Sequence, residues 1–150
     1  MRVFHRIDEL ERAIGTHLGY SDWQTISQER IDAFADATGD HQWIHVDPAR
    51  AAQSRFGSTI AHGYLTLSLV PLFLNQIYRV EGTTMAVNYG ANRVRYPSPV
   101  PVGSRLRGGV ELLGLEPTAS GQRLTSRVTI DREGGDKPAC VAEVLSLLVL

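Results

Sequence analysis

The spacing of apolar residues divides the chain into a helical first half and an extended second half. Residues 7–15 and 27–38 carry apolar side chains at helical spacing, which is typical of amphipathic helices. The two segments end at Gly15 and Gly39, residues suited to a left-handed helix cap. A further short helix is predicted over residues 47–53, because an aspartate cap precedes a proline at the first helical position.

The segment 61–78 predicts a longer helix with apolar side chains on every face. Such a helix must be surrounded by protein, so we expect it to lie buried at the centre of the fold. Pro71 in its interior should kink it, because the ring removes one hydrogen bond. Residues 56–78 carry no charge, yet the dense apolar part spans only residues 64–74. That is too short for a membrane-spanning helix, and we expect no membrane insertion.

After Gly82 the pattern changes to strand-like runs separated by glycine, proline and serine. These runs cover residues 85–100, 104–118, 122–134 and 138–150. The sequence at 133–137 is the strongest hairpin turn, and residues 17–27 indicate an edge strand or an extended loop. Helices first and strands later favour an α+β fold with an antiparallel sheet. A sheet wrapped around a long buried central helix accommodates both halves of the chain.

Composition narrows the class of protein. The chain has 150 residues, of which 43% are hydrophobic and 21% charged, so we expect one globular domain over residues 1–150. Fifteen basic and sixteen acidic residues give a net charge of −1, which argues against a nucleic-acid-binding protein. Cys140 is the single cysteine, and no zinc-ligand spacing is present, so we expect neither a disulfide nor a metal site. The charged N-terminus does not resemble a signal peptide, which favours a cytoplasmic location.

The chemically informative residues lie between positions 39 and 63. Asp40 follows one predicted helix end and His45 precedes the next helix start, so both sit in one short link between rigid elements. Histidine moves protons near neutral pH, and a paired carboxylate can share a water molecule with it. Gly63 opens the long helix, where free backbone N–H groups form an anion site. From spacing alone, a solvated aspartate and histidine would give the same pattern, and His62-Gly63 is equally ambiguous by itself.

The same residues also resemble the motif of a known family. The pattern Gly39-Asp40-x-x-x-Ile44-His45, followed by Ala51 and Ala61-His62-Gly63, resembles the MaoC-like dehydratases, which are (R)-specific enoyl-CoA hydratases of hot-dog fold. The resemblance covers most of the chain. It implies that Asp40 and His45 bind and activate water, and that the backbone N–H of Gly63 holds the thioester oxygen. The usual Asn-Pro of the motif is replaced here by Gln42 and Trp43, which removes the rigidity of proline and adds bulk.

This resemblance implies a cofactor-independent hydro-lyase that adds water reversibly to trans-2-enoyl-CoA and gives (R)-3-hydroxyacyl-CoA in fatty-acid metabolism. The alternative is a 3-hydroxyacyl-ACP dehydratase of fatty-acid synthesis, acting on acyl-carrier-protein (ACP) substrates. A hot-dog thioesterase would need a carboxylate on the long helix, and residues 61–78 contain none. A non-catalytic acyl-CoA-binding module would not need the pair Asp40 and His45.

Two further expectations concern assembly and substrate preference. A short sheet around one helix leaves an unpaired edge and an apolar flank, so we expect at least a homodimer, as the resemblance also implies. Trp43 either packs under the catalytic link or lines the channel for the acyl chain. Arg93, Arg95, Arg105 and Arg107 alternate on two strands, where they either contact coenzyme A phosphates or form an ordinary exposed face, and none is assigned to a site.

Overall fold

The structure is a computed structural model that describes residues 1–150, with six helices and eight strands. The helices are α1 (Ile7–Arg12), α2 (Gln28–Thr38), α3 (Trp43–Val46), α4 (Pro48–Ala52), α5 (Gly63–Ser68) and α6 (Val70–Ile77). The strands are β1 (Arg2–Phe4), β2 (His17–Tyr20), β3 (Gln24–Thr25), β4 (Tyr78–Val80), β5 (Met85–Arg95), β6 (Arg105–Thr118), β7 (Gly121–Arg132) and β8 (Cys140–Val149).

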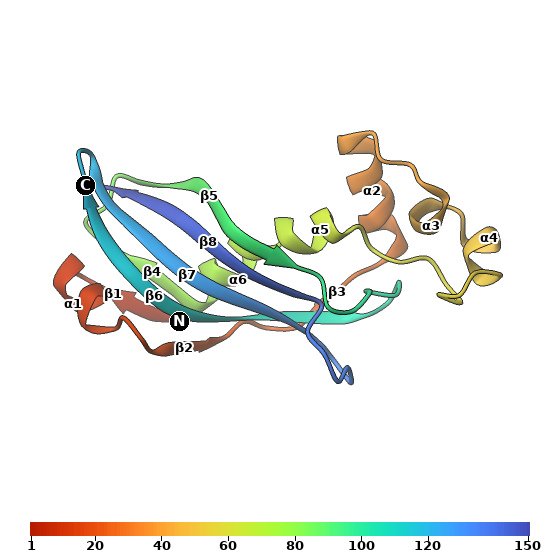
Figure 1. The fold of residues 1–150 in the computed structure, drawn as a ribbon, viewed down its shortest axis with the longest axis horizontal. Coiled ribbons are helices and arrows are strands. Elements are labelled where there is room, and N and C mark those ends of the chain that lie inside the picture. The colour runs from red at the N-terminus through yellow and green to blue at the C-terminus, as the bar shows by residue number, and fades with distance from the viewer.

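An antiparallel sheet with the strand order β2-β6-β7-β8-β5 forms the main layer (Figure 1). The short strand β3 adds to the same sheet by pairing with β6. All four predicted strand runs are present, and the predicted turn at 133–137 lies in the β7–β8 connection. Residues 17–27 contribute β2 and β3, so the expectation of an edge strand there is confirmed.

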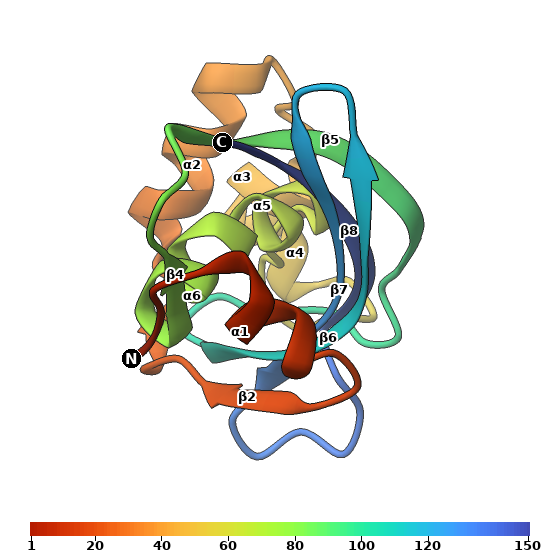
Figure 2. The ribbon, with the colours of Figure 1, turned by 90° about the vertical axis from the view of Figure 1, so that its left-hand side faces the viewer.

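The sheet curls around α5 and α6, which lie on its concave side (Figure 2). Phe73 of α6 is fully buried, and it packs directly over Gly108 of β6. A Cβ atom at Gly108 would lie 2.7 Å from the Cβ of Phe73, so only glycine permits this approach of helix and sheet. Truncating a buried phenylalanine to alanine costs about 3–5 kcal/mol, which indicates how much such a contact contributes to stability.

The long central helix expected over residues 61–78 is not confirmed as one unbroken, enclosed element. Residues 63–77 form two shorter helices, α5 and α6, which are separated at Leu69. The interruption has a physical cause in Pro71, the second residue of α6, which has no N–H to bond the preceding turn. One face of this pair is also open in the single chain, where Tyr64 is 71% exposed. No helix has the length and apolar character that a membrane crossing needs.

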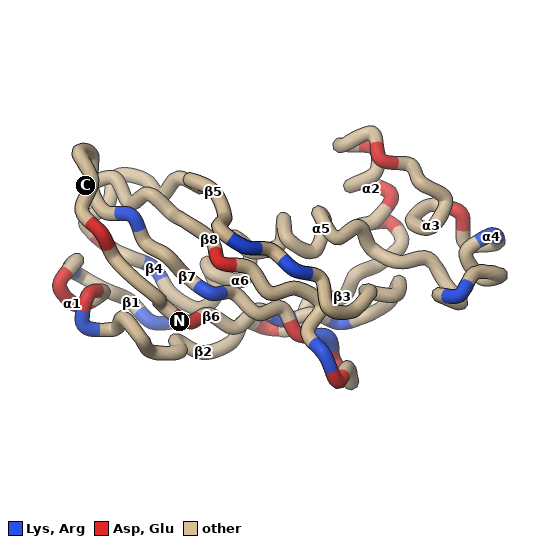
Figure 3. Tube along the Cα trace, viewed as in Figure 1, with Lys and Arg blue, Asp and Glu red and all other residues tan.

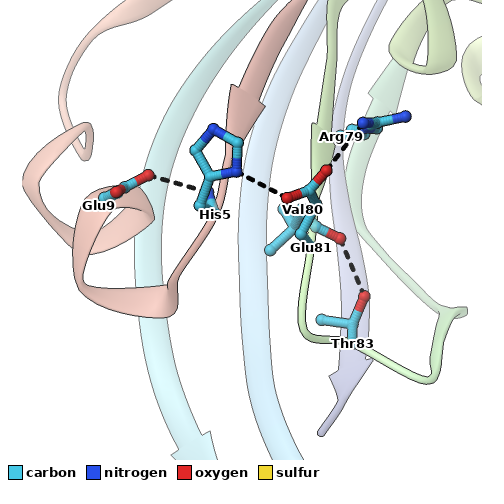
Figure 4. Close-up of polar contacts among 6 residues, drawn as sticks. All are labelled: His5, Glu9, Arg79, Val80, Glu81 and Thr83. Atoms are coloured by element: carbon cyan, nitrogen blue, oxygen red, sulfur yellow. Dashed lines mark hydrogen bonds and ion pairs between the residues drawn. The ribbon is translucent and has the colours of Figure 1, made fainter.

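The N-terminal residues are anchored beside the end of α6. Strand β1 pairs in parallel with β4, an element that the apolar pattern did not reveal. Nδ1 of His5 lies 2.6 Å from one carboxylate oxygen of Glu81, and Arg79 donates to the other oxygen at 2.8 Å (Figure 4). The backbone N–H of His5 donates to Glu9 at 2.9 Å, which ties α1 to the same group. The hydrogen bond with His5 lowers the pKa of Glu81.

Candidate active site

The segment that carries the predicted site residues lies beyond one end of the sheet. Figure 1 shows α2, α3 and α4 there, with α5 between them and the sheet. The predicted caps position this segment: Ser27 Oγ accepts from the N–H of Arg30 at 3.2 Å, and Gly39 ends α2 with a left-handed φ of 79°. Asp47 caps α4 by accepting from the N–H of Arg50 at 3.0 Å. The chain therefore leaves α2 and enters α4 in fixed directions.

Asp40 lies directly after the glycine that ends α2, and its side chain is exposed. One carboxylate oxygen accepts from the backbone N–H of Gln42 at 3.3 Å, which orients the carboxylate toward its own link. The backbone carbonyl of Asp40 is held separately, by a hydrogen bond of 2.9 Å from Nε2 of His62. Asp40 is thus fixed at both its main chain and its side chain while remaining open to solvent.

His45 lies on α3, a short helix where the sequence indicated only an irregular link. The residue is 6% exposed, and its Nδ1 lies 2.7 Å from the carbonyl oxygen of Ile60. Because a carbonyl can only accept, Nδ1 carries the proton, and the neutral ring presents Nε2 as a free acceptor. Burial lowers the pKa of His45, and the neighbouring His62 lowers it further, against the opposing effects of Ile60 and Asp40. The neutral, basic form of His45 therefore persists to a lower pH than that of an ordinary histidine.

The structure brings the two predicted catalytic side chains together. A carboxylate oxygen of Asp40, a ring nitrogen of His45 and a ring nitrogen of His62 all lie within 4.8 Å of one another. Asp40 and His45 share no direct hydrogen bond. Two hydrogen bonds to one water molecule span about 4.6 Å at tetrahedral angles, so this spacing suits a single bridging water.

The same three residues are the one group of potential metal ligands in the fold. The rings of His45 and His62 are stacked, however, with centroids 3.8 Å apart and an interplanar angle of 24°. Nitrogen lone pairs lie in the ring planes, so the lone pairs of two stacked rings lie in two nearly parallel planes and do not converge on a point between the rings. A zinc ion needs ligands that converge from tetrahedral directions at about 2 Å. The geometry therefore does not fit a metal ion.

Gly63 is the first residue of α5, and its N–H is one of those without an acceptor inside the helix. The residue follows His62 directly, so this N–H lies next in the chain to the ring stacked on His45. The ring of Tyr96 packs against Gly63, and a Cβ atom there would lie 3.2–3.3 Å from three of its ring atoms. A glycine at this position therefore allows the ring of Tyr96 to lie close to the main chain at the start of α5.

Trp43 supports the catalytic link. Its half-buried ring lies under the guanidinium of Arg50, with 4.3 Å from the guanidinium carbon to the ring centroid. This contact joins α3 to α4. An apolar groove of about 790 Å³ runs between the central helices and the edge of the sheet, and Trp43 does not line it. The contact with Arg50 agrees with the packing role considered for Trp43, and its role in a substrate channel stays a prediction.

Residues 9–133 match the family described as the MaoC-like domain. The chain belongs to this MaoC-like family. The 3-hydroxyacyl-thioester dehydratase Z of Mycobacterium tuberculosis (strain H37Rv) is 54% identical over 144 residues, which are 95% of each chain. Nodulation protein N of Rhizobium leguminosarum is 45% identical over 138 residues, 90% of this chain and 86% of the relative. Several relatives are named dehydratases or hydratases, and the protein is a hydro-lyase.

Solved structures agree on the architecture of this MaoC-like chain. The R-hydratase PhaJ1 of Pseudomonas aeruginosa superposes with a TM-score of 0.75, over 91% of this chain and 81% of the other, at 24% identity. At that identity the likeness concerns the fold alone. It supports the expected hot-dog arrangement, an antiparallel sheet around central helices.

Some residues that contact this MaoC-like site could not be recognised from the sequence. Gln28 donates to the backbone carbonyl of His45 at 2.8 Å, and its amide oxygen accepts a short hydrogen bond from the buried hydroxyl of Thr59. No pattern marks Gln28, since its partners lie far along the chain. Tyr96 likewise carries no signal. His62, in contrast, belongs to the Ala-His-Gly motif, so its place was visible although its role was not.

The single cysteine and two of the arginines considered above lie outside the candidate site. Cys140 is fully buried, and burial raises the pKa of its thiol to about 11, as expected for a core cysteine. Arg105 pairs with Glu133 at 3.0 Å, and Arg107 lies 3.8 Å from Asp131. Both arginines therefore have carboxylate partners on the sheet, and whether they also contact coenzyme A phosphates stays an open prediction.

Proposed function

We propose that the protein is an (R)-specific enoyl-CoA hydratase of fatty-acid metabolism that adds water reversibly to trans-2-enoyl-CoA. The observation that carries this proposal is that a carboxylate oxygen of Asp40 and a ring nitrogen of His45 lie within 4.8 Å of each other, a spacing that suits one shared water. The (R) configuration follows from the resemblance of the Asp40–His45 motif to (R)-specific hydratases. We propose residues 1–150 as one domain for this reaction.

In the proposed reaction, Asp40 and His45 hold one water molecule between them. The water oxygen attacks C3 of the enoyl thioester while its proton passes to the pair, and negative charge moves to the carbonyl oxygen as an enolate. The N–H of Gly63 donates a hydrogen bond to that oxygen, and a donor in such a position is worth about 2.7–4 kcal/mol in acyl-transfer sites. The pair then returns a proton to C2, which gives the 3-hydroxyacyl thioester. No metal ion or organic cofactor takes part.

The second candidate is the reverse reaction on 3-hydroxyacyl-ACP. It is favoured by the relative from M. tuberculosis, whose name describes a dehydratase of 3-hydroxyacyl thioesters without specifying the carrier. A hot-dog thioesterase remains disfavoured, because α5 and α6 carry no carboxylate. Comparing kcat/KM for the CoA and ACP thioesters of one acyl chain separates the two candidates.

The test is a spectrophotometric assay with crotonyl-CoA, in which hydration removes the absorbance of the conjugated thioester. The wild-type protein should consume the substrate and give the (R) product on chiral analysis. Asp40→Asn keeps the size of the side chain and removes its charge, and it should lower kcat by about 10²–10⁴-fold. An inactive wild-type protein on both CoA and ACP thioesters would refute the proposal, as would a fully active Asp40→Asn variant.

We also propose that the protein forms a homodimer through the free edge of β5. The exposed large apolar side chains near this edge are Tyr64, Met85, Val87, Tyr89 and Tyr96. Figure 3 shows charges on β5 only toward its C-terminal end, where Arg93 and Arg95 lie. A free strand edge in a monomer is usually protected by charges, so a bare apolar edge favours pairing with a second chain.

The dimer is tested by light scattering at micromolar concentration. The wild-type protein should have the mass of two chains, and the double variant Val87→Lys, Tyr89→Lys should have the mass of one. The substitution Arg132→Lys, on β7 and two strands away from β5 in the sheet order, serves as the control and should leave the dimer intact. A monomeric wild-type protein would contradict the dimer without bearing on the reaction.

A further inference from the structure

Three functional groups of the site come from three separate elements, and one side chain contacts or adjoins all of them. The ring of His62 stacks on His45, its Nε2 bonds the carbonyl of Asp40, and its own backbone continues into Gly63. We propose that His62 is a positioning residue that holds Asp40, His45 and the N–H of Gly63 in one rigid arrangement. This inference rests on the proposed function.

The ring of His62 has a fixed orientation. It is 2% exposed, with Phe34 of α2 at a centroid distance of 5.0 Å and His45 of α3 at 3.8 Å. The ring thus contacts side chains from two helices of the segment beyond the sheet. Rotation of the His45 ring would break this stacking as well as the bond to Ile60. Two contacts of different kinds therefore fix the direction of the free Nε2 of His45.

The hydrogen bonding of His62 shows that stability alone does not explain the residue. The carbonyl of Asp40 can only accept, so Nε2 of His62 carries a proton. Nδ1 is then an acceptor in the neutral ring, and it is buried without a partner. A buried polar atom without a partner is destabilising, and a phenylalanine ring would fill the same space without it. What phenylalanine lacks is the N–H that holds Asp40.

The position of the Nε2–H of His62 explains what this group does for Asp40. Asp40 lies in an exposed link directly after the end of α2, where the main chain has no helical hydrogen bonds to hold it. The bond from His62 fixes this link to the residue that precedes α5, over a separation of 22 positions in the chain. A shift of the link would change the distance from the carboxylate of Asp40 to His45, and with it the position where the two residues can bind a water molecule. Misplacement of a reacting group by about 1 Å can cost 10²-fold in rate.

Two variants separate the two contacts. His62→Phe keeps the ring between Phe34 and His45 but removes the bond to Asp40. His62→Gln keeps an N–H donor at the distance of Nε2 but removes the ring. His41→Gln is the matched control, because His41 is exposed, lies beside Asp40 in the chain and pairs with Asp36 at 2.9 Å. The assays are hydration of crotonyl-CoA, with kcat and KM determined separately, and thermal unfolding followed by circular dichroism.

We expect kcat to fall about tenfold or more in both His62 variants while KM changes less than about threefold. The melting temperature of His62→Phe should equal or exceed that of the wild type, and His41→Gln should behave as the wild type. A loss of kcat confined to one variant supports the inference and assigns the role to the contact that this variant removes.

The inference is overturned if both His62 variants keep the wild-type kcat, if only KM changes, or if the loss of activity equals the loss of folded protein. These results all require an active wild-type enzyme. An inactive wild-type enzyme contradicts the proposed function instead, so the two failures are distinct.

Discussion

Replacing Gly63 by alanine tests the oxyanion role of its N–H with a perturbation of known size. The added Cβ would lie 3.2, 3.2 and 3.3 Å from three ring atoms of Tyr96. Carbon atoms in contact prefer about 3.5–4.0 Å, so the ring or the start of α5 must move by about 0.3–0.5 Å. Complete loss of an oxyanion donor costs about 2.7–4 kcal/mol, and a displacement of this size should remove part of it.

We therefore expect Gly63→Ala to lower kcat for crotonyl-CoA about tenfold, which corresponds to about 1.4 kcal/mol. Stability should change little, because alanine favours the helix by up to about 1 kcal/mol and the contact with Tyr96 offsets that gain. The absorbance assay gives kcat and KM, and thermal unfolding gives the stability. The effect should appear in kcat rather than KM, since the enolate charge develops only during the reaction.

The control is the double variant Gly63→Ala, Tyr96→Ala, compared with Tyr96→Ala alone. Removing the ring provides space for the Cβ, so adding Gly63→Ala to the Tyr96→Ala background should cost less than about threefold. Full activity of Gly63→Ala would refute the role of this N–H. An undiminished tenfold loss in the Tyr96→Ala background would refute the steric argument.

Three further predictions concern the other parts of the site. Because the pKa of His45 is lowered, its base form persists below the usual value of about 6.5, and the acid limb of kcat/KM should lie below pH 6.5; a limb near pH 7 would contradict this. Trp43→Ala should lower the hydration rates of short and long enoyl-CoAs alike, and it should lower the free energy of unfolding by about 1–2 kcal/mol. A change in chain-length preference would instead indicate that Trp43 lines the substrate channel. Dialysis against a chelator should leave kcat unchanged, and activity restored only by added metal would overturn the geometric argument against an ion at Asp40 and His45.

The parts of the fold that were predictable depend on local chemistry. The caps at Ser27 and Gly39 are residues whose side chain or backbone favours a helix end wherever it occurs, so α2 was predicted to within a residue of its ends. The interruption of the central helix was signalled by Pro71, but the actual break at Leu69 and the exposed face of Tyr64 were not. Exposure depends on what covers a face, and this is a tertiary or quaternary property.

The candidate site divides in the same way. Asp40, His45 and Gly63 could be proposed as site residues because a short motif fixes their types and spacing, and the structure brings Asp40 and His45 close together. The tethers that hold them could not be found, because the bond from Gln28 to His45 and the contact of Tyr96 with Gly63 join distant residues. Helix α3 was also missed, since four residues are too few to show a period. Neither the pairing of β1 with β4 nor any other long-range register was readable from the apolar pattern.

The placement of α2, α3 and α4 beyond the end of the sheet separates the candidate site from the strands that form the main layer. The sheet strands are joined by continuous ladders from β2 to β5, whereas Asp40 lies in a link and His45 on a four-residue helix that only a few hydrogen bonds hold to the rest of the fold. Regions with few buried contacts open locally at a lower free energy than the whole domain. On heating, enzymatic activity should therefore be lost before the β-sheet signal in circular dichroism, and hydrogen exchange should be fastest at residues 40–47. Coincident loss of both signals would instead show that the catalytic segment and the sheet unfold as one cooperative unit.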